Sequence, residues 1–304
     1  MMDSVSADIE RHLDWITLTE ALEAGHRLPR AQITDSFLTR GDDTLLTRCA
    51  LIDGLGMAVK TATVFGGNPA KGLPRVNGMM TLFSDANGMP EAMVDFTLVT
   101  KWKTAGDSLL AARKLARPDA KRVLILGAGH VAASMVAAYR AGFPGCEITI
   151  WNRTPAAAEA LAKQVGAQAV TDLGDAVSHA EIIATTTMAS TPILRGEWLS
   201  AGTHVDLIGA FRADLREADD TALQRARLFV DSRATTIHHI GELKIPIASG
   251  AIREADILGD FYDIASGQFA RKTPEEITIC KNGGGAHLDL ITAQYIWQTA
   301  RAQN

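Results

Sequence analysis

The stretch RVLILGAGHVAA, residues 122–133, is the part of the sequence that decides the fold. Its apolar run predicts a buried strand over 122–126, and the alanine-rich run that follows predicts a helix over 130–141. Between them, Gly127 to Ala132 fit the pattern G-x-G-x-x-A. Such glycines allow a tight turn and let backbone N–H groups approach a pyrophosphate at the start of the helix. We therefore expect four residues here to bind a dinucleotide: Gly127, Gly129, His130 and Val131.

The alternative is an ordinary tight turn between a strand and a helix, because glycines are common. The rest of the chain favours the dinucleotide site. A strand is predicted at 147–151 and a helix from Thr154 to about Val165, and further strands follow at 181–185, 204–209, 228–231 and within EEITICK, 275–281. Strands that alternate with helices predict a parallel sheet covered on both faces. The expected fold class is α/β, with a Rossmann domain that binds NAD(P).

The end of the second strand of this domain indicates which cofactor it prefers. NAD sites usually place Asp or Glu there to bind the ribose 2′-hydroxyl. This chain has Trp151-Asn152-Arg153-Thr154 instead. Arg153 can pair with a 2′-phosphate, and Asn152 and Thr154 can donate hydrogen bonds to it. We therefore predict NADPH, with NADH possible. Thr154-Pro155 also fits the start of a helix, and the two roles are compatible.

Two threonines after the strand at 181–185, Thr185 and Thr187, are further candidates for cofactor binding. The carboxyl ends of the strands face the ligand crevice in such sheets. An equally good explanation is a strand end rich in β-branched residues.

The first 118 residues predict a mixture of helix and strand. Ser6 to Gly25 has helical spacing, and Thr104 to Leu115 predicts a second helix. Asp85 to Gly88 predicts a hairpin turn. The short apolar runs predict strands, and the end of the chain predicts a last helix: Cys49–Val64, Asn77–Phe83 and Glu91–Leu98 for the strands, and about Ala286 to Ala302 for the helix.

Composition excludes several classes of protein. The chain has 304 residues, which suggests two domains, and 47% hydrophobic residues, which excludes general disorder. A net charge of -5 argues against broad binding to nucleic acid or anionic membrane. Cys49, Cys146 and Cys280 are scattered, so neither a metal site nor a disulfide framework is expected. The acidic start lacks a secretory h-region, and we expect a cytoplasmic protein.

Several longer segments together resemble the ornithine cyclodeaminase/mu-crystallin family over nearly the whole chain. They are GMAVKTATVFGGNPAKGLP (56–74), VDFTLVT (94–100, taken as the end of paired strands), KWKTAGDSLLAARKLA (101–116), LGAGHVAA (126–133), TTTMASTPIL (185–194), DLIGAFRADLREAD (206–219) and EITICKNGGGAHLDL (276–290). The resemblance implies a substrate and dimerisation domain, 1–118 with 287–304, and a Rossmann domain, 119–286. It also implies a homodimer that acts on amino acids or cyclic imino acids.

The resemblance assigns substrate-binding roles to two lysines. Lys60 matches a family lysine in the substrate pocket. A lysine between apolar strand residues is expected to be partly buried, which lowers its pKa and suits it to pair with a carboxylate or to donate a proton. The alternative is a lysine that extends along the surface from a strand end. Lys103 replaces the family's usual arginine, so it keeps the charge but loses the bidentate fork.

Other candidates follow from the same resemblance. Arg30 is the candidate for an N-terminal family arginine, with Arg27 as a rival. Thr104, expected beside the start of its helix, is a candidate for contact with the cofactor phosphates. Gly209 and the glycines 283–285, represented by Gly284, are expected near the nicotinamide. Asp289 matches a family aspartate and is expected to be structural.

One departure from the family pattern decides the predicted reaction. Ornithine cyclodeaminases have G-x-D at a strand end, whereas this chain has Gly209-Ala210-Phe211. Phe211 cannot bind the substrate's ammonium group and would make the pocket apolar. Asp214 and Glu217 are expected to be solvated, so neither compensates. Ring closure with loss of ammonia needs such a carboxylate, whereas reduction of a preformed cyclic C=N does not.

The predicted function is therefore NADPH-dependent reduction of Δ1-pyrroline-2-carboxylate or Δ1-piperideine-2-carboxylate to L-proline or L-pipecolate. Lys60 and Lys103 hold the substrate carboxylate, Arg30 assists, and Phe211 lines the pocket. Three alternatives remain. They are an ornithine cyclodeaminase with bound NAD, a non-enzymatic NADPH-binding protein like mu-crystallin, and an alanine-type dehydrogenase that forms an open-chain amine.

Overall fold

The computed structural model describes residues 2–303, which form two compact units. Of the described residues, the first unit comprises 2–103 and 285–303, and the second comprises 104–284. The boundary between the two units falls within helix α2 (Phe96–Leu115) and just before helix α9 (Ala286–Ala302). The division expected from the sequence, at 118 and 287, places all of α2 in the first domain.

The second unit is built on an eight-stranded sheet in the order β13-β12-β14-β11-β10-β7-β8-β9. Every strand pair in it is parallel, as the alternation of strands and helices predicts. The strands are β7 (Arg122–Leu126), β8 (Glu147–Trp151), β9 (Gln168–Ala169), β10 (Ile182–Thr185), β11 (His204–Leu207), β12 (Arg227–Val230), β13 (Ile257–Gly259) and β14 (Thr278–Lys281). The strand order reverses beside β7, which is where ligands bind in such sheets.

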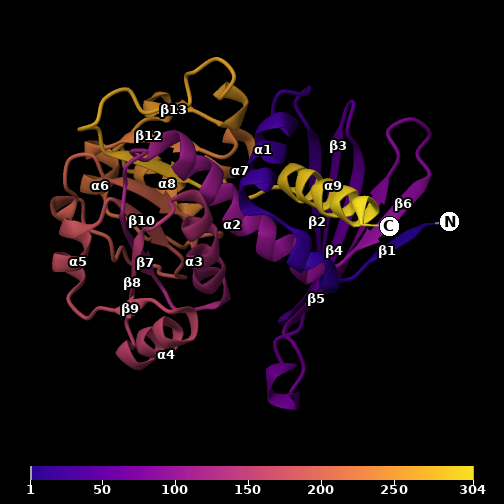
Figure 1. Ribbon diagram of the computed structural model, residues 1–304, viewed down its shortest axis with the longest axis horizontal. Helices are drawn as coiled ribbons and strands as arrows, with labels where there is room; N and C mark the ends of the chain where they lie inside the picture. Colours follow the sequence, from indigo (N-terminus) through magenta and orange to yellow (C-terminus); the bar gives the residue numbers. More distant parts are fainter. Residues whose placement is uncertain (1, 304) are drawn as a thin grey trace. The chain divides into compact units, whose positions relative to one another are not determined.

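Helices flank this parallel sheet in Figure 1. They are α3 (His130–Gly142), α4 (Pro155–Val165), α5 (Leu173–His179), α6 (Asp220–Arg225), α7 (Arg233–Thr236) and α8 (Gly241–Ala248), with short 3-10 turns η3 (Gly196–Trp198), η4 (Glu254–Asp256) and η5 (Phe261–Asp263). The strands are short apolar runs, and Leu124, Ile183 and Val205 are fully buried between the layers. Burial on both faces explains why their sequences do not alternate.

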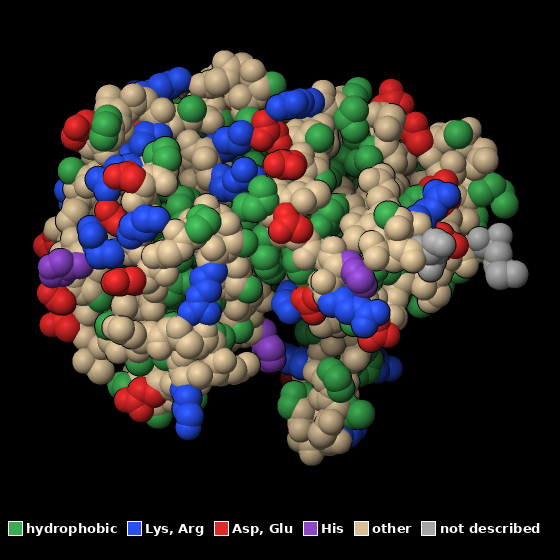
Figure 2. All heavy atoms as spheres, viewed as in Figure 1, with side chains coloured by type: hydrophobic (Ala, Val, Ile, Leu, Met, Phe, Trp, Pro, Cys, Tyr) green, Lys and Arg blue, Asp and Glu red, His purple; other side chains and the backbone are tan. Residues whose placement is uncertain are grey.

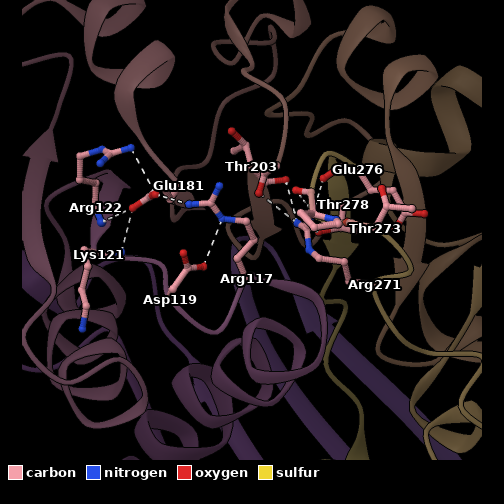
Figure 3. Close-up of polar contacts among 12 residues, drawn as sticks. Arg117, Asp119, Lys121, Arg122, Glu181, Thr203, Arg271, Thr273, Glu276 and Thr278 are labelled. Carbon is pink, nitrogen blue, oxygen red and sulfur yellow. Dashed lines mark hydrogen bonds and ion pairs between the residues drawn. The ribbon is translucent and has the colours of Figure 1, made fainter.

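The amino-terminal edge of the parallel sheet is closed by a polar network, shown in Figure 3. The Glu181 carboxylate accepts hydrogen bonds from the backbone N–H groups of Lys121 (2.8 Å) and Arg122 (3.0 Å), and pairs with Arg117 (2.5 Å). The Arg271 guanidinium donates to the Thr278 hydroxyl (3.0 Å) and to backbone carbonyls nearby. Side chains thus satisfy backbone groups at this edge. In such sheets the ligand crevice lies at the opposite edge, at the carboxyl ends of the strands.

The first unit is a six-stranded sheet in the order β1-β6-β5-β4-β3-β2. Its pairs are antiparallel except for β1 with β6. The elements are β1 (Asp3–Val5), η1 (Ala7–His12), α1 (Trp15–Gly25), β2 (Gln32–Arg40), β3 (Asp43–Ile52), β4 (Gly56–Val64), η2 (Pro69–Lys71), β5 (Val76–Phe83) and β6 (Pro90–Val94).

Helix α9 packs against this sheet and against α1. Every residue from Ala286 to Trp297 is buried, so α9 is a core helix rather than an amphipathic one. The N-terminal segment holds α9 through polar contacts. The Tyr295 hydroxyl accepts from the Asp14 N–H (2.7 Å), and the Trp297 indole donates to the Asp3 carboxylate (2.8 Å).

The structure corrects the predicted boundaries in the first unit. The run Cys49–Val64 is two strands, β3 and β4, joined by a turn in which Gly54 has a φ of 84°. Glu91–Leu98 is not one strand, because β6 ends at Val94 and α2 begins at Phe96, where the Asp95 carboxylate accepts from the Leu98 N–H (2.7 Å).

Of the other predictions in this unit, some are confirmed and others are wrong. The expected helix start near Thr104 was wrong, since α2 begins at Phe96 and Thr104 lies in its middle. Strands β1 and β2 were missed. The run from Ser6 to Gly25 divides at Asp14, which caps α1. The hairpin turn at 85–88 is confirmed between β5 and β6, with a φ of 70° at Gly88.

Among residues 2–303, no helix combines the length and apolar character needed to cross a bilayer.

Candidate active site

The glycine turn after β7 is shaped by close backbone packing. Gly127 has a φ of 119°, and a Cβ atom there would lie 2.3 Å from the Thr186 hydroxyl oxygen. Only glycine fits, because both the backbone angle and the space exclude a side chain. Gly129 is the N-cap residue of α3 and faces open space, with no side chain capping the helix. An uncapped helix start beside an open glycine suits a bound pyrophosphate.

Several predicted cofactor residues lie at the surface near this turn. His130 and Val131 are exposed in the first turn of α3. Arg153 and Thr154 are exposed in the loop between β8 and α4. Thr154 occupies the N-cap position as predicted, but its hydroxyl makes no capping hydrogen bond.

The polar side chain before Arg153 makes a local contact. The Asn152 amide donates to the Thr154 carbonyl (3.1 Å) and so shapes the loop that carries Arg153. On the face in Figure 2, positive and negative side chains are interspersed over the second unit.

The threonines at the end of β10 and just after it differ in solvent exposure. Thr185 is fully buried, and its hydroxyl points toward the Asp206 carbonyl (3.5 Å), so the structure does not present it at the surface. Thr187 is partly exposed. Its hydroxyl and its N–H both donate to the Glu217 carboxylate, each at 2.7 Å. Because its hydroxyl proton is already donated to Glu217, Thr187 can contact a cofactor through this hydroxyl only by accepting a hydrogen bond.

Glu217 is the clearest correction to the sequence-based site. It was expected to be solvated, yet it is fully buried. Besides Thr187, its carboxylate accepts from the N–H groups of Gly209 (2.8 Å) and Ala210 (3.1 Å). A Cβ atom on Gly209 would lie 2.1 Å from the Thr187 carbonyl oxygen. Glu217 thus joins the loops that follow β10 and β11, and Gly209 lets them touch.

Two more buried carboxylates organise the same edge of the sheet. Glu242 accepts from the N–H groups of Glu217 (2.7 Å) and Ala218 (2.9 Å), and burial beside Glu217 raises its pKa to about 7. Asp231 accepts from the N–H groups of Gly283 (2.8 Å) and Gly284 (2.6 Å). The Gly284 N–H is therefore engaged by Asp231, and this carboxylate fixes the glycine turn before α9.

In the first unit, charged side chains share one row across the sheet. Strand register places Asp35, Arg48 and Lys60 opposite one another on β2, β3 and β4. Arg48 binds Asp35 through two nitrogens, the shortest contact being 2.7 Å. Arg48 and Lys60 are like charges on paired positions, an arrangement that costs free energy unless carboxylates or a bound anion offset it.

Lys60 is the deepest cation of this row. Its side chain is 8% exposed, and its ammonium donates to the Asp289 carboxylate of α9 at 2.8 Å. Burial lowers the pKa of Lys60, an effect that Asp289 opposes and that Lys103 and Arg48 reinforce. Partial burial with a lowered pKa was predicted from the sequence and is confirmed. The second oxygen of the Asp289 carboxylate is buried and has no hydrogen-bond partner among the described residues.

An apolar floor adjoins the charged row. Leu46, Ala62 and Gly78 occupy the next row on the same face of the sheet. A Cβ atom on Gly78 would lie 2.6 Å from the Phe96 ring, so the glycine makes room for that ring. The Lys60 ammonium lies 4.9 Å from the centre of the same ring. Cations beside a flat apolar surface suit a small ring that carries a carboxylate.

The remaining predicted substrate residues are less closely grouped. Lys103, partly buried on α2, is near enough to Lys60 to influence its pKa. Arg30 is exposed in the segment before β2. Phe211 is 58% exposed in the second unit, with the Arg212 guanidinium 5.8 Å from its ring centre. The described residues contain no cluster of three or more His, Cys, Asp or Glu that would bind a metal.

Sequence reasoning missed Arg48, Asp35 and the pairing of Asp289 with Lys60. Arg48 fell outside the predicted strand, which was started at Cys49. A strand extended back to Asp43 would have placed Arg48 opposite Lys60. Asp289 was noticed but was assigned a purely structural role, because the sequence does not show that it contacts Lys60. Cys280 is fully buried.

The chain is similar to known proteins over nearly its whole length. Residues 33–304 match the model of the ornithine cyclodeaminase/mu-crystallin family. The Delta(1)-pyrroline-2-carboxylate reductase of Paracoccus denitrificans is 52% identical over 296 residues, 95% of this chain and 94% of that protein.

Two solved structures share the fold over the whole chain. One is the Thermococcus litoralis Delta(1)-pyrroline-2-carboxylate reductase in complex with NADH and L-proline, with a TM-score of 0.88, 26% identity and coverage of 99% of this chain and 98% of the other. The other is an archaeal alanine dehydrogenase dimer with bound NAD, with a TM-score of 0.89, 27% identity and coverage of 100% and 97%.

Proposed function

The chain belongs to the ornithine cyclodeaminase/mu-crystallin family, and we propose that it is an NAD(P)H-dependent reductase that converts Δ1-pyrroline-2-carboxylate to L-proline. The observation that supports this most is the row of cations beside an apolar floor in the first unit. It fits a small cyclic imino acid, and the relative that is 52% identical bears the name of this reductase. The six-membered Δ1-piperideine-2-carboxylate has the same charge and one more methylene, and it is the second substrate to test.

The substrate carboxylate binds to the cations of the first unit. Lys60, Lys103 and Arg48 carry three positive charges, and Asp289 and Asp35 carry two negative ones. The remaining positive charge matches one carboxylate. Arg48 supplies the planar guanidinium that Lys103 lacks, and its bond to Asp35 holds it in one orientation. Arg30 assists from the surface segment before β2.

The carboxyl edge of the parallel sheet fits a nicotinamide coenzyme, which supplies the hydride when it is bound. Gly127 and Gly129 leave space for its pyrophosphate at the start of α3. His130, Val131, Thr187 and Gly209 border this edge, and Gly284 shapes the turn that follows β14. Thr104 remains a candidate for phosphate contact from the middle of α2, although it does not lie at a helix start. We place the 2′-phosphate of NADPH at Arg153, with Asn152 and Thr154 beside it.

Lys60 gives the proton that imine reduction requires. As a hydride adds to the ring carbon, the electron pair of the C=N bond moves to nitrogen, which takes a proton from the Lys60 ammonium. A lysine whose pKa is lowered by burial donates more readily than an exposed one. The neutral amine of Lys60 then regains a proton from water, and the product nitrogen takes its second proton from the solvent.

Phe211 favours reduction over cyclodeamination, because its ring cannot accept a proton or bind an ammonium group. A dehydrogenase that forms an open-chain amine is the second candidate function. It is favoured by the similarity to the archaeal alanine dehydrogenase. A protein that binds NADPH without turnover is the third.

A homodimer completes the proposal. Large apolar side chains are exposed on the strands of the first unit, among them Phe37 (61%), Leu38 (67%) and Met79 (50%). Burying such residues stabilises association. The similar alanine dehydrogenase is described as a dimer. Sedimentation of the purified chain should give twice the mass of one chain.

A substrate panel tests the proposed activity. The purified chain is mixed with NADPH or NADH and with each cyclic imine, or with pyruvate and ammonium, and coenzyme oxidation and product formation are followed. We expect the cyclic imines to be reduced without ammonium, faster with NADPH. Ammonium-dependent turnover of pyruvate would favour the dehydrogenase instead. Tight NADPH binding with no turnover would favour the non-enzymatic protein.

A further inference from the structure

We propose that Asp289 is the positioning residue of Lys60: its carboxylate fixes the ammonium in place and keeps it charged, so that Lys60 can donate a proton to the imine nitrogen. This inference rests on the proposed function and extends it. Asp289 itself transfers no proton to the substrate. It acts through Lys60, from a helix at the opposite end of the chain.

The geometry makes the pair specific. The Lys60 ammonium and one Asp289 oxygen are 2.8 Å apart, and the two side chains are 8% and 1% exposed. At this depth a carboxylate needs a partner, because an isolated buried charge is costly. A hydrogen bond of this kind also limits the ammonium to one direction, whereas a lysine in water samples many.

The second Asp289 oxygen indicates that the pair lies in a ligand-binding site and is not purely structural. It is buried and has no hydrogen-bond partner among residues 2–303. A buried acceptor without a donor is rare in a purely structural ion pair. A donor on the ligand would satisfy it, and the nitrogen of the reduced ring carries N–H groups that the imine lacks. The same carboxylate therefore suits the product as well as Lys60.

Charged or titratable side chains from several elements surround the pair. Arg48 comes from β3, Asp35 from β2, Lys103 from α2 and His287 from α9, and His26 follows α1. Burial lowers the pKa of His287 well below its usual value, so His287 stays neutral near pH 7. Arg48 and Lys103 both disfavour the charged form of Lys60. Among the described residues, Asp289 is the carboxylate that favours the charged form of Lys60, so a proton donor at this position depends on Asp289.

The test compares the pH profile of kcat for the wild type, Asp289→Asn and Asp35→Asn. The two variants each remove one negative charge from the same face of the sheet, but only Asp289 contacts Lys60. Loss of an opposite charge at this distance lowers the pKa of a lysine by about 1–3 units. We expect the alkaline limb of the Asp289→Asn profile to move down by about one pH unit or more. The limb of Asp35→Asn should move less, because Asp35 binds Arg48 rather than Lys60.

Failure of the positioning role can be distinguished from failure of the proposed function. An equal loss of kcat at every pH in Asp289→Asn, or the same shift in both variants, would overturn the positioning role. A wild type that does not reduce the imine would instead overturn the proposed function. Thermal unfolding checks that each variant is folded.

A second variant keeps the proposal testable if Asp289→Asn does not fold. Asp289→Glu retains the charge but displaces it by one methylene. We expect kcat to fall by about tenfold or more with the alkaline limb in place, because orientation is lost and charge is kept. Unchanged kcat in Asp289→Glu would contradict positioning by Asp289.

Discussion

The two units use buried carboxylates in different ways. In the second unit, Glu217, Glu242 and Asp231 accept hydrogen bonds from backbone N–H groups and fix the loops at the carboxyl edge of the sheet. In the first unit, Asp289 binds the side chain of Lys60. A carboxylate bound by backbone shapes a loop, whereas one bound by a lysine tunes a reactive group. This difference matches the proposed function, in which the second unit binds the coenzyme and the first unit supplies the proton.

The largest loss of activity is expected when Lys60, the buried cation of the first unit, is replaced. Lys60→Met should lower kcat/KM by about a thousandfold, since a positioned proton donor contributes roughly 10²–10⁴. It should also destabilise the fold by about 3–5 kcal/mol, because Asp289 is left buried without its partner. Steady-state kinetics and denaturant unfolding measure the two effects. Lys71→Met, an exposed lysine of the same unit, serves as the control and should change neither.

The next largest effect is expected in the second unit, on the affinity for the coenzyme. Glu217→Gln should weaken coenzyme binding about tenfold to a hundredfold, because a buried carboxylate that loses charged hydrogen bonds costs about 1–3 kcal/mol. Calorimetric titration with NADPH and NADH measures it. The matched control is Asp214→Asn, whose carboxylate is exposed and bonds only to Arg212 among the residues described. If Glu217→Gln raised KM for the imine and left coenzyme affinity intact, the proposal that the second unit binds the coenzyme and the first binds the imine would be wrong.

A smaller and more selective effect is expected at Arg153. Arg153→Glu should weaken NADPH binding roughly tenfold more than NADH binding, because it replaces a charge-assisted contact with repulsion of the 2′-phosphate. Lys163→Glu, an exposed charge reversal at the end of α4, should leave the ratio of the two affinities unchanged. Equal losses for both coenzymes would show that Arg153 does not bind the 2′-phosphate.

The smallest effect on activity is expected at Glu242, where stability should respond to pH. Its pKa is raised to about 7 in the fold, above its ordinary 4.5. The stability that protonated Glu242 contributes is therefore complete below about pH 4.5 and is lost as the pH rises through 7. The wild type should lose up to about 3 kcal/mol of unfolding free energy over this range relative to Glu242→Gln. Denaturant unfolding at pH 5 and pH 8 checks this, and parallel pH dependence of the two proteins would contradict it.

Local features of both regions were predictable from the sequence. The glycine turn at Gly127, the parallel strands and the burial of Lys60 follow from short patterns of residues. The partners of these residues were not predictable, because Asp289 lies 229 positions from Lys60 and a sequence pattern carries no signal over that distance. Glu217 was missed for a related reason. A charged residue in a polar segment resembles a solvated one until the chain folds over it.

One assay separates imine reduction from cyclodeamination: the purified chain is given either Δ1-pyrroline-2-carboxylate with a reduced coenzyme, or L-ornithine with NAD and no reductant. We predict L-proline from the imine, with one coenzyme oxidised for each L-proline formed, and no L-proline from L-ornithine. Release of ammonia and L-proline from L-ornithine, with no net consumption of coenzyme, would contradict it. That result would mean that the cations around Lys60 support cyclodeamination even with Phe211 in place of the family's aspartate.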